Sequence, residues 1–288
     1  MALVYDRRLA TVKDEPQFGG AALYFFYHTM FGRTLLKWLV RPSVSKIVAW
    51  YSTLPCTKHR ADQYVRRYQI DRNSYSESNW RTFAAFFNRK LSSLQVETDE
   101  YALVACAESA LMTYPISKDA MLNVKHRSYR LTDIIGDELL AAKFEGGTAF
   151  VYRLAMHNYH RYIYPNSGKI IAKRALPGVL HTISSVSQEF PVYSINQRHV
   201  SILEVHGIGI IAMIEVGAMI AGKIVNDGPE TFVKGCEKGH FEIGGSTIIV
   251  LYTKDRVQVD EDIQKNNSSG VEVSVNIGET IGRLCLND

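Results

Sequence analysis

The stretch from Lys234 to Tyr252 reads KGCEKGHFEIGGSTIIVLY and places a glycine-rich turn directly before a run of β-branched and apolar residues. The run from Ser246 to Tyr252 predicts a buried strand, because such residues fit a pleated sheet. The glycines before it permit backbone conformations that other residues resist. On residue types alone, the stretch is a turn that enters a strand, with Ser246 at the junction.

Similar short runs recur through the carboxy-terminal two thirds of the chain. After about Tyr101, glycine, proline and asparagine separate segments with strand character: Thr148–Leu154, Ser201–Val205 and Ile208–Val216. One helix is predicted over Leu131–Lys143, opened by a capping pattern at Thr132 and Asp133. The polar stretch Gln264–Gly270 is predicted to be a surface loop. This part of the chain is therefore expected to be mostly antiparallel β.

The preceding segment, from Ala21 to about Phe87, has helical periodicity instead. Its apolar residues recur at steps of three and four, and Pro42 and Pro55 divide the run into separate helices. Its basic and aromatic residues suit helices that lie on anionic lipid, or a helical layer with a solvated basic edge. The predicted fold class is α+β, with a helical region over residues 1–100 packed on a mostly antiparallel β core over residues 101–288.

Composition restricts the functional classes. With 288 residues, 46% of them hydrophobic, the chain can bury a substantial core. The net charge of +4, from 33 basic and 29 acidic residues, is too small to indicate nucleic-acid binding but suits an anionic surface. Four scattered cysteines favour a reducing compartment, and neither a signal peptide nor a membrane-spanning helix is predicted. We therefore expect a cytoplasmic protein, attached peripherally to the cytoplasmic side of the membrane.

The Lys234–Tyr252 stretch as a whole resembles the self-processing site of phosphatidylserine decarboxylases, in which a lysine-glycine pair, an acidic residue and an aromatic residue precede Gly-Ser-Thr. Other family-like stretches occur in the expected order, among them Phe86–Leu91, Tyr159–Tyr162 and Glu215–Ala218. The resemblance extends from about residue 20 to Gly282 and is most marked for the shorter bacterial members.

The resemblance implies a proenzyme that cleaves itself between Gly245 and Ser246. The Ser246 hydroxyl attacks the Gly245 carbonyl, an ester replaces the amide, and elimination leaves a pyruvoyl group at the new chain end. This pyruvoyl group is the implied cofactor for the decarboxylation of phosphatidylserine to phosphatidylethanolamine. The implied partners are a phospholipid substrate and an anionic membrane surface, with a homodimer left open. No metal ion or nucleic acid is expected.

Two segments depart from the family pattern at positions that the resemblance makes catalytic. Cys106–Ser109 stands where the family has Pro-Ala-Asp-Gly, so Glu108 supplies the carboxylate that supports the processing base. Where the family has Asp-Tyr-His-Arg-x-His, Asn158 replaces the first residue and Ile163 the last. An isoleucine cannot accept a proton, and general-base assistance is typically worth ~10²- to 10⁴-fold in rate.

His160, which keeps its place in this pattern, is therefore the predicted group for proton transfer, with Glu108 in support. Without the resemblance, a histidine flanked by tyrosines is more often a hydrogen-bonded structural residue. His181 and His199 are further candidates. Arg161 is predicted to bind the substrate carboxylate or phosphate through its planar fork, with an internal ion pair as the alternative.

Three functions remain open at this point. The first is a pyruvoyl-dependent decarboxylase of phosphatidylserine. The second keeps the chemistry but acts on a soluble amino acid or related amine, and a requirement for lipid vesicles separates the two. The third is an unprocessed, inactive homologue that binds lipid or protein, motivated by Asn158 and Ile163. Such a protein would remain a single chain on a gel.

Overall fold

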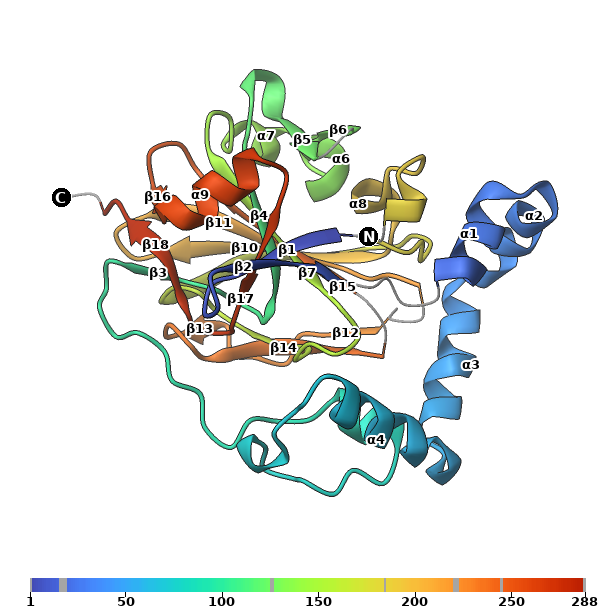
Figure 1. Ribbon diagram of the computed structural model, residues 1–288. Coiled ribbons are helices and arrows are strands. Elements are labelled where there is room, and N and C mark those ends of the chain that lie inside the picture. Colours follow the sequence, from blue (N-terminus) through green and yellow to red (C-terminus); the bar gives the residue numbers. More distant parts are fainter. Residues whose placement is uncertain are drawn as a thin grey trace.

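The computed structural model describes residues 2–15, 20–124, 127–183, 185–219, 223–243 and 246–286. Within these residues, a large sheet of ten strands lies at the centre, with smaller sheets and short helices on its faces (Figure 1). A set of amino-terminal helices lies along one side of this β structure (Figure 1). The predicted α+β class with a mostly antiparallel core is confirmed.

The large sheet has the strand order β13-β9-β10-β11-β15-β7-β4-β17-β1-β2. In that order the strands are Thr231–Phe232, Gly168–Leu176, Arg198–Val205, Gly209–Val216, Ser246–Tyr252, Thr148–Leu154, Ser109–Pro115, Glu272–Val275, Ala2–Asp6 and Thr11–Glu15. Neighbours run antiparallel except β1 and β17, which are parallel. The strand that begins at Ser246 therefore lies in the interior of the sheet, between β11 and β7.

Two three-stranded sheets pack on one face of the large sheet and enclose the larger hydrophobic core. The first, β12-β14-β8, consists of Lys223–Val225, Glu237–Glu242 and Arg161–Ile163. The second, β16-β18-β3, consists of Val257–Val259, Thr280–Leu284 and Ala102–Val104, and helix α9 (Glu261–Ser268) follows β16. Phe241 of β14, Met213 of β11 and Ile248 of β15 all belong to this core. The segment before Ser246 thus comes from the small sheet, and the segment after it from the large one.

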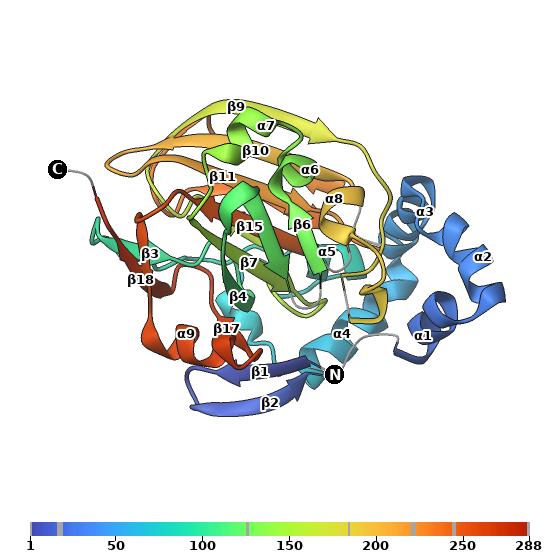
Figure 2. The same cartoon turned by 90° about the horizontal axis from the view of Figure 1, so that it is seen from above.

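The opposite face of the large sheet is covered by a hairpin and short helices (Figure 2). They are β5 (Met121–Val124), β6 (Arg127–Arg130), α6 (Leu131–Ile135), α7 (Glu138–Ala142) and α8 (Val192–Ile195), with single turns of 3₁₀ helix at Lys118–Ala120 and Ser185–Ser187. Ile248 of β15 belongs to the first core and Ile249 to this second one. Since successive side chains of a strand point to opposite faces, Ser246 faces the small sheets and Thr247 faces the helices.

The amino-terminal helices are α1 (Gly20–His28), α2 (Met30–Leu39), α3 (Pro42–Ser52), α4 (Lys58–Arg67) and α5 (Phe83–Phe87), with 3₁₀ turns at Pro55–Thr57 and Arg72–Ser74. Pro42 and Pro55 each lie at the start of a helix. Proline fits there because the first N–H groups of a helix form no intrahelical hydrogen bond. The predicted division at these prolines is confirmed. Tyr27 of α1 and Leu36 of α2 pack on the 179–190 loop. No helix among the described residues is long and apolar enough to span a membrane.

Two local predictions were wrong. The helix predicted over Leu131–Lys143 is two short helices, because Gly136 adopts the left-handed conformation (φ 75°) and the side chain of Asp137 caps the second helix. The loop predicted at Gln264–Gly270 lies largely in α9, whose buried Ile263 anchors that helix to the core. In both places, one residue with a specific conformation or contact outweighs the average character of the stretch.

An amino-terminal hairpin of β1 and β2 lies within residues 1–100, the region predicted to be helical, and precedes the helical periodicity that begins at Ala21. Arg7, between the two strands, forms ion pairs of 2.7–2.8 Å with Asp260, Asp262 and Glu279 near the other end of the chain. Partners so distant in sequence leave no local pattern. The hairpin therefore belongs to the β core, whereas a domain boundary near residue 100 stays a prediction.

Candidate active site

Ser246 is the first residue of β15 and its side chain is fully buried, with 0% of the residue exposed. Its register partner on β7 is Leu154. Among the described residues, no group forms a hydrogen bond with its hydroxyl. A buried polar group left without a partner costs about 1–3 kcal/mol, and such a cost is tolerated where the group reacts. Gly245, on the other side of the predicted cleavage bond, lies outside the described residues.

The backbone is strained shortly before Ser246. Ile243 has a φ of 28°, a value that β-branched residues avoid. Its side chain is buried in a cluster with Trp80, Phe86 and Phe87. A conformation of this kind persists only where the surrounding packing enforces it. The aromatic cluster around α5 therefore holds the chain in a high-energy conformation three residues before the predicted nucleophile.

His160 lies between β7 and β8 and is 1% exposed. Its ring packs against Phe87, with 3.9 Å between the ring centroids. Its Nδ1 lies 2.9 Å from the backbone carbonyl oxygen of Asn158. Because a carbonyl oxygen only accepts, this bond assigns the proton of the neutral ring to Nδ1 and leaves the lone pair on Nε2. The turn thus fixes the tautomer in which Nε2 is the basic nitrogen.

Glu108 and Asn158 contact each other directly. The side-chain amide of Asn158 donates to Oε1 of Glu108 over 2.9 Å, and its carbonyl oxygen accepts from the backbone N–H of Ala155 over 2.7 Å. An aspartate at position 158 could accept from Ala155 but could not donate to Glu108. Asn158 and Glu108 are therefore a matched donor and acceptor. The carboxylate of Glu108 therefore braces the turn that carries His160.

Comparison with known proteins identifies the family of this site. Residues 83–283 match the family model described as phosphatidylserine decarboxylase. The chain belongs to the phosphatidylserine decarboxylase family. It is 33% identical over 283 residues to phosphatidylserine decarboxylase proenzyme 2 of Clostridium acetobutylicum, with 97% of both chains covered. It is 31% identical to the proenzyme of Ruminiclostridium cellulolyticum, covering 98% of this chain and 97% of the relative, and 30% identical to that of Fusobacterium nucleatum, covering 96% of each.

Ile163 occupies the position at which the family resemblance places a proton acceptor. It packs in an apolar cluster with Tyr159 and Ile277. Its neighbour Tyr162 belongs to the larger core, so the alternation along β8 turns the Ile163 side chain away from that core and from the face on which Ser246 lies. In this member of the phosphatidylserine decarboxylase family, the position is part of a hydrophobic contact.

Arg161 contacts other parts of the protein through its whole guanidinium group. Nη1 forms a 2.6 Å ion pair with Glu237 of β14, while Nε and Nη2 donate to the backbone carbonyls of Asn88 and Arg89. These contacts join β8 to β14 and to the segment after α5. Binding of a substrate carboxylate or phosphate by Arg161 stays a prediction, and it would require Arg161 to exchange one of these partners.

The two further histidines lie in different surroundings. Nδ1 of His181 lies 3.0 Å from the Tyr27 hydroxyl, and burial lowers the pKa of His181 to about 4, so this residue is neutral at pH 7 and joins α1 to the 179–190 loop. His199 lies beside Asn226, and burial lowers its pKa as well. Neither belongs to the turn that carries His160.

One group among the described residues has the composition of a metal site: Asp227, Glu237 and His240, whose ligand atoms lie within 4.8 Å of one another. The guanidinium of Arg161 already neutralises Glu237. Burial and the positive charge of Arg161 lower the pKa of His240. A metal cation would be repelled by the same charge, so we assign no metal to this group.

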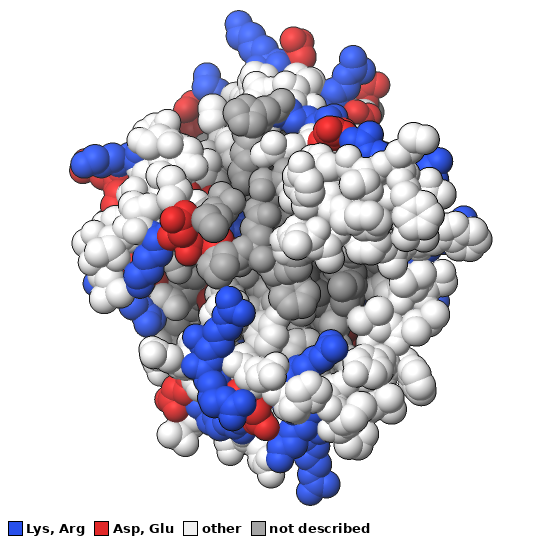
Figure 3. Space-filling model, turned by 45° about the vertical axis from the view of Figure 1, so that its right-hand side comes forward, with Lys and Arg blue, Asp and Glu red and all other residues white. Residues whose placement is uncertain are grey.

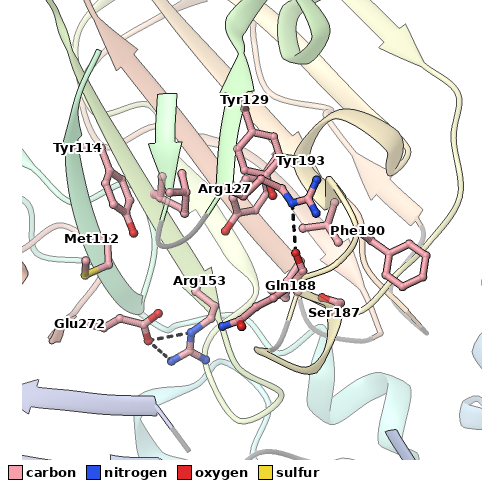
Figure 4. Close-up of a pocket in the computed structure, with 14 residues that line it drawn as sticks. Met112, Tyr114, Arg127, Tyr129, Arg153, Ser187, Gln188, Phe190, Tyr193 and Glu272 are labelled. Carbon is pink, nitrogen blue, oxygen red and sulfur yellow. Dashed lines mark hydrogen bonds and ion pairs between the residues drawn. The ribbon is translucent and has the colours of Figure 1, made fainter. Parts of the chain in front are cut away.

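A cavity of about 60 Å³ lies on the opposite face of the large sheet, beside β4 and β7 (Figure 4). Tyr114, Tyr129 and Tyr193 line it, and the Nε of Arg153 donates to Glu272 at its base over 2.9 Å. Arg153 is the register partner of Thr247, whose side chain faces this side of the sheet. The sheet therefore separates the cavity from the side chain of Ser246.

A buried ion pair between Lys238 and Glu215 lies close to Ser246 and has no counterpart among the predicted site residues. The sequence signal was the charge itself: Glu215 is the one acidic residue in the apolar run Ile208–Val216, and strands that are buried on both faces rarely contain charged residues. A lone charge in such a strand indicates a buried partner, but the sequence does not say which.

Proposed function

We propose that this chain is a self-cleaving, pyruvoyl-dependent decarboxylase that converts phosphatidylserine to phosphatidylethanolamine and carbon dioxide. The observation that carries the proposal is Ser246: a buried hydroxyl without a partner among the described residues, three positions after the strained Ile243, inside the segment that matches the family. The names of the relatives, which are phosphatidylserine decarboxylase proenzymes, support the substrate and the need for processing.

In the proposed self-cleavage, Nε2 of His160 accepts the proton of the Ser246 hydroxyl, and Oγ adds to the carbonyl carbon of Gly245. The C–N bond between the two residues breaks, and the peptide becomes an ester. Loss of the Cα proton of residue 246 then expels the carboxylate of Gly245, and water hydrolyses the resulting dehydroalanine to a pyruvoyl group and ammonia. The products are residues 1–245, with an ordinary carboxylate, and residues 246–288, with a blocked amino terminus.

The pyruvoyl group supplies a carbonyl that accepts the electrons released when the substrate carboxylate departs as carbon dioxide. The protein contributes the surroundings of residue 246. In the proposed reaction, His160 returns a proton to the substrate carbon, while Phe87, which packs on its ring, and the buried core exclude water. Thr247 continues into β15 and fixes the chain end within the sheet.

Intact-mass analysis of the purified protein tests the proposal directly. We expect a small fragment that begins at position 246 with a pyruvoyl amino terminus, together with carbon dioxide release from vesicles that contain phosphatidylserine. A chain that stays at 32.5 kDa after prolonged incubation would contradict the proposal and favour an unprocessed binding module. Release from a soluble amino acid, but not from vesicles, would instead favour the soluble-substrate alternative.

The surface of the amino-terminal helices favours a lipid substrate over a soluble one. Its exposed apolar side chains include Met30, Phe31 and Trp38 on α2, with Met30 88% and Trp38 61% exposed. Figure 3, which brings this side of the molecule forward, shows a broad area with few charged residues, bordered by Lys and Arg side chains. Asp62 is the one acidic residue between Gly20 and Arg67. We propose that this surface docks on an anionic membrane.

Removal of two of these side chains should weaken binding to vesicles. We expect the double variant F31A/W38A to lose most of its co-sedimentation with phosphatidylserine-containing vesicles at low salt, because the two side chains supply much of the insertable area of α2. Raised salt should weaken binding of the parent protein. The matched control is Leu139→Ala, since Leu139 is 82% exposed but lies on α7. Equal loss in the control, or none in the double variant, would contradict the assignment.

A further inference from the structure

Lys238 and Glu215 form an ion pair of 2.8 Å whose side chains are 1% and 0% exposed. Glu215 lies on β11 of the large sheet, in register with Ile248 of β15. Lys238 lies on β14 of the small sheet. The ion pair therefore crosses the interior between the two sheets, two residues along β15 from Ser246 and on the same face.

The remaining polar atoms of this group are also satisfied. The second carboxylate oxygen of Glu215 accepts from the side-chain amide of Asn226 over 2.9 Å, and the amide oxygen of Asn226 accepts from the hydroxyl of Tyr162 over 2.8 Å. Nζ of Lys238 lies 5.9 Å from the centroid of the Tyr162 ring. Tyr162 follows His160 by two residues, so the network also reaches the segment that carries the predicted base.

Lys238 and Glu215 lie on the elements that flank the predicted cleavage bond. β14 carries Lys238 and leads through Ile243 towards position 245, while β11 carries Glu215 and is a direct neighbour of the strand that begins at Ser246. The elements before and after the predicted bond thus belong to different sheets. The ion pair joins these two sheets.

Energetics favour a positional role for the pair. Burying two charges removes their hydration, and a well-packed apolar pair of the same volume is often as stable or more stable, whereas loss of one partner strongly destabilises a fold. Stability alone therefore does not account for this pair, but a directional contact that specifies one register does. We propose that Lys238 and Glu215 are positioning residues for self-cleavage, which hold the carbonyl-side segment and the strand of Ser246 in the geometry for attack. This inference rests on the proposed function.

The test compares three full-length variants with the parent protein: K238M, K238R and the double variant E215Q/K238M. Each is made by cell-free synthesis, and the rate constant for appearance of the small fragment is measured over time and over a pH series, beside the thermal midpoint. We expect K238M to cleave at least tenfold more slowly and K238R to remain within threefold of the parent. The double variant should unfold near the parent midpoint yet cleave at least tenfold more slowly, by the same factor at each pH.

The double variant distinguishes loss of the positioning contact from the effect of an unpaired buried charge, because it leaves no unpaired charge in the core. If it cleaves at the parent rate, the inference is overturned. Should neither K238M nor the double variant fold, Tyr162→Phe carries the test: it removes the bond to Asn226 without changing a charge, and an unchanged cleavage rate overturns the inference. A parent chain that does not cleave contradicts the proposed function and this inference together, whereas a cleaving parent with unaffected variants contradicts the inference alone.

Discussion

Ser246→Ala is expected to remain a single chain of 32.5 kDa and to release no carbon dioxide. The alanine has no oxygen to add to the carbonyl of Gly245 and no leaving group to eliminate, so neither the cut nor the pyruvoyl group can form. The effect should be complete rather than partial, because both steps require the side-chain oxygen of residue 246. Intact mass after extended incubation and carbon dioxide release from phosphatidylserine vesicles measure the two losses separately.

Ser201→Ala is the matched control for this experiment. Ser201 lies on β10, two strands from β15, and it is likewise buried, with 3% of the residue exposed. The chemical change and the burial are the same, but the position is not at the predicted bond. We expect this control to cleave and turn over like the parent. Processing of the Ser246→Ala protein would show that the cut lies elsewhere.

His160→Ala should slow self-cleavage by at least tenfold, because general-base assistance typically supplies ~10²- to 10⁴-fold in rate. In the neutral form of this buried ring, the hydrogen bond to the Asn158 carbonyl leaves Nε2 as the basic nitrogen. The measurement is a time course of fragment appearance. His157→Ala is the control, because this ring lies in the same turn but stacks on Tyr68. If His160→Ala cleaves like the parent, His181, His199 or a bound water has to be considered.

Exchanging the donor and the acceptor of the hydrogen bond between Asn158 and Glu108 tests whether this contact positions the turn that carries His160. Asn158→Asp would place two carboxylates where an amide now donates to Oε1 of Glu108, and their repulsion should displace the turn and slow cleavage about tenfold. The double variant E108Q/N158D restores a donor and an acceptor with their positions exchanged, so it should recover most of the rate. Recovery would be absent if the carboxylate of Glu108 were needed for its charge alone.

The strand from Ser246 to Tyr252 was predictable to the residue, because β-branched residues follow a glycine turn there and nothing distant opposes that preference. The break at Gly136 was less visible, since the surrounding apolar pattern continues through it. The amino-terminal hairpin could not be predicted from local pattern. Its position depends on Arg7 and on pairing with β17, and both partners lie more than two hundred residues away.

In the candidate site, too, contacts between residues distant in sequence could not be predicted. Sequence supplied Ser246, His160 and Glu108 through their places in a family pattern, but treated Glu108 and Asn158 as two separate departures. Only the folded chain shows that they are hydrogen-bonded to each other, because a turn between β7 and β8 meets the segment before β4. Residue types state which contacts a side chain can form, whereas the partner is decided by tertiary packing.

The place of β15 in the sheet has a consequence for how the protein can fold. A cut before Ser246 would make β15 and β17 part of a separate short chain, yet β15 lies between β11 and β7, and β17 between β4 and β1. Before the cut, folding is a unimolecular process, independent of concentration. After it, recovery from unfolding requires two chains to meet, so it becomes bimolecular, and the mature protein would persist mainly through the barrier to its unfolding. The uncut chain would thus contain all strands of the sheet in one molecule, whereas neither fragment would contain them alone.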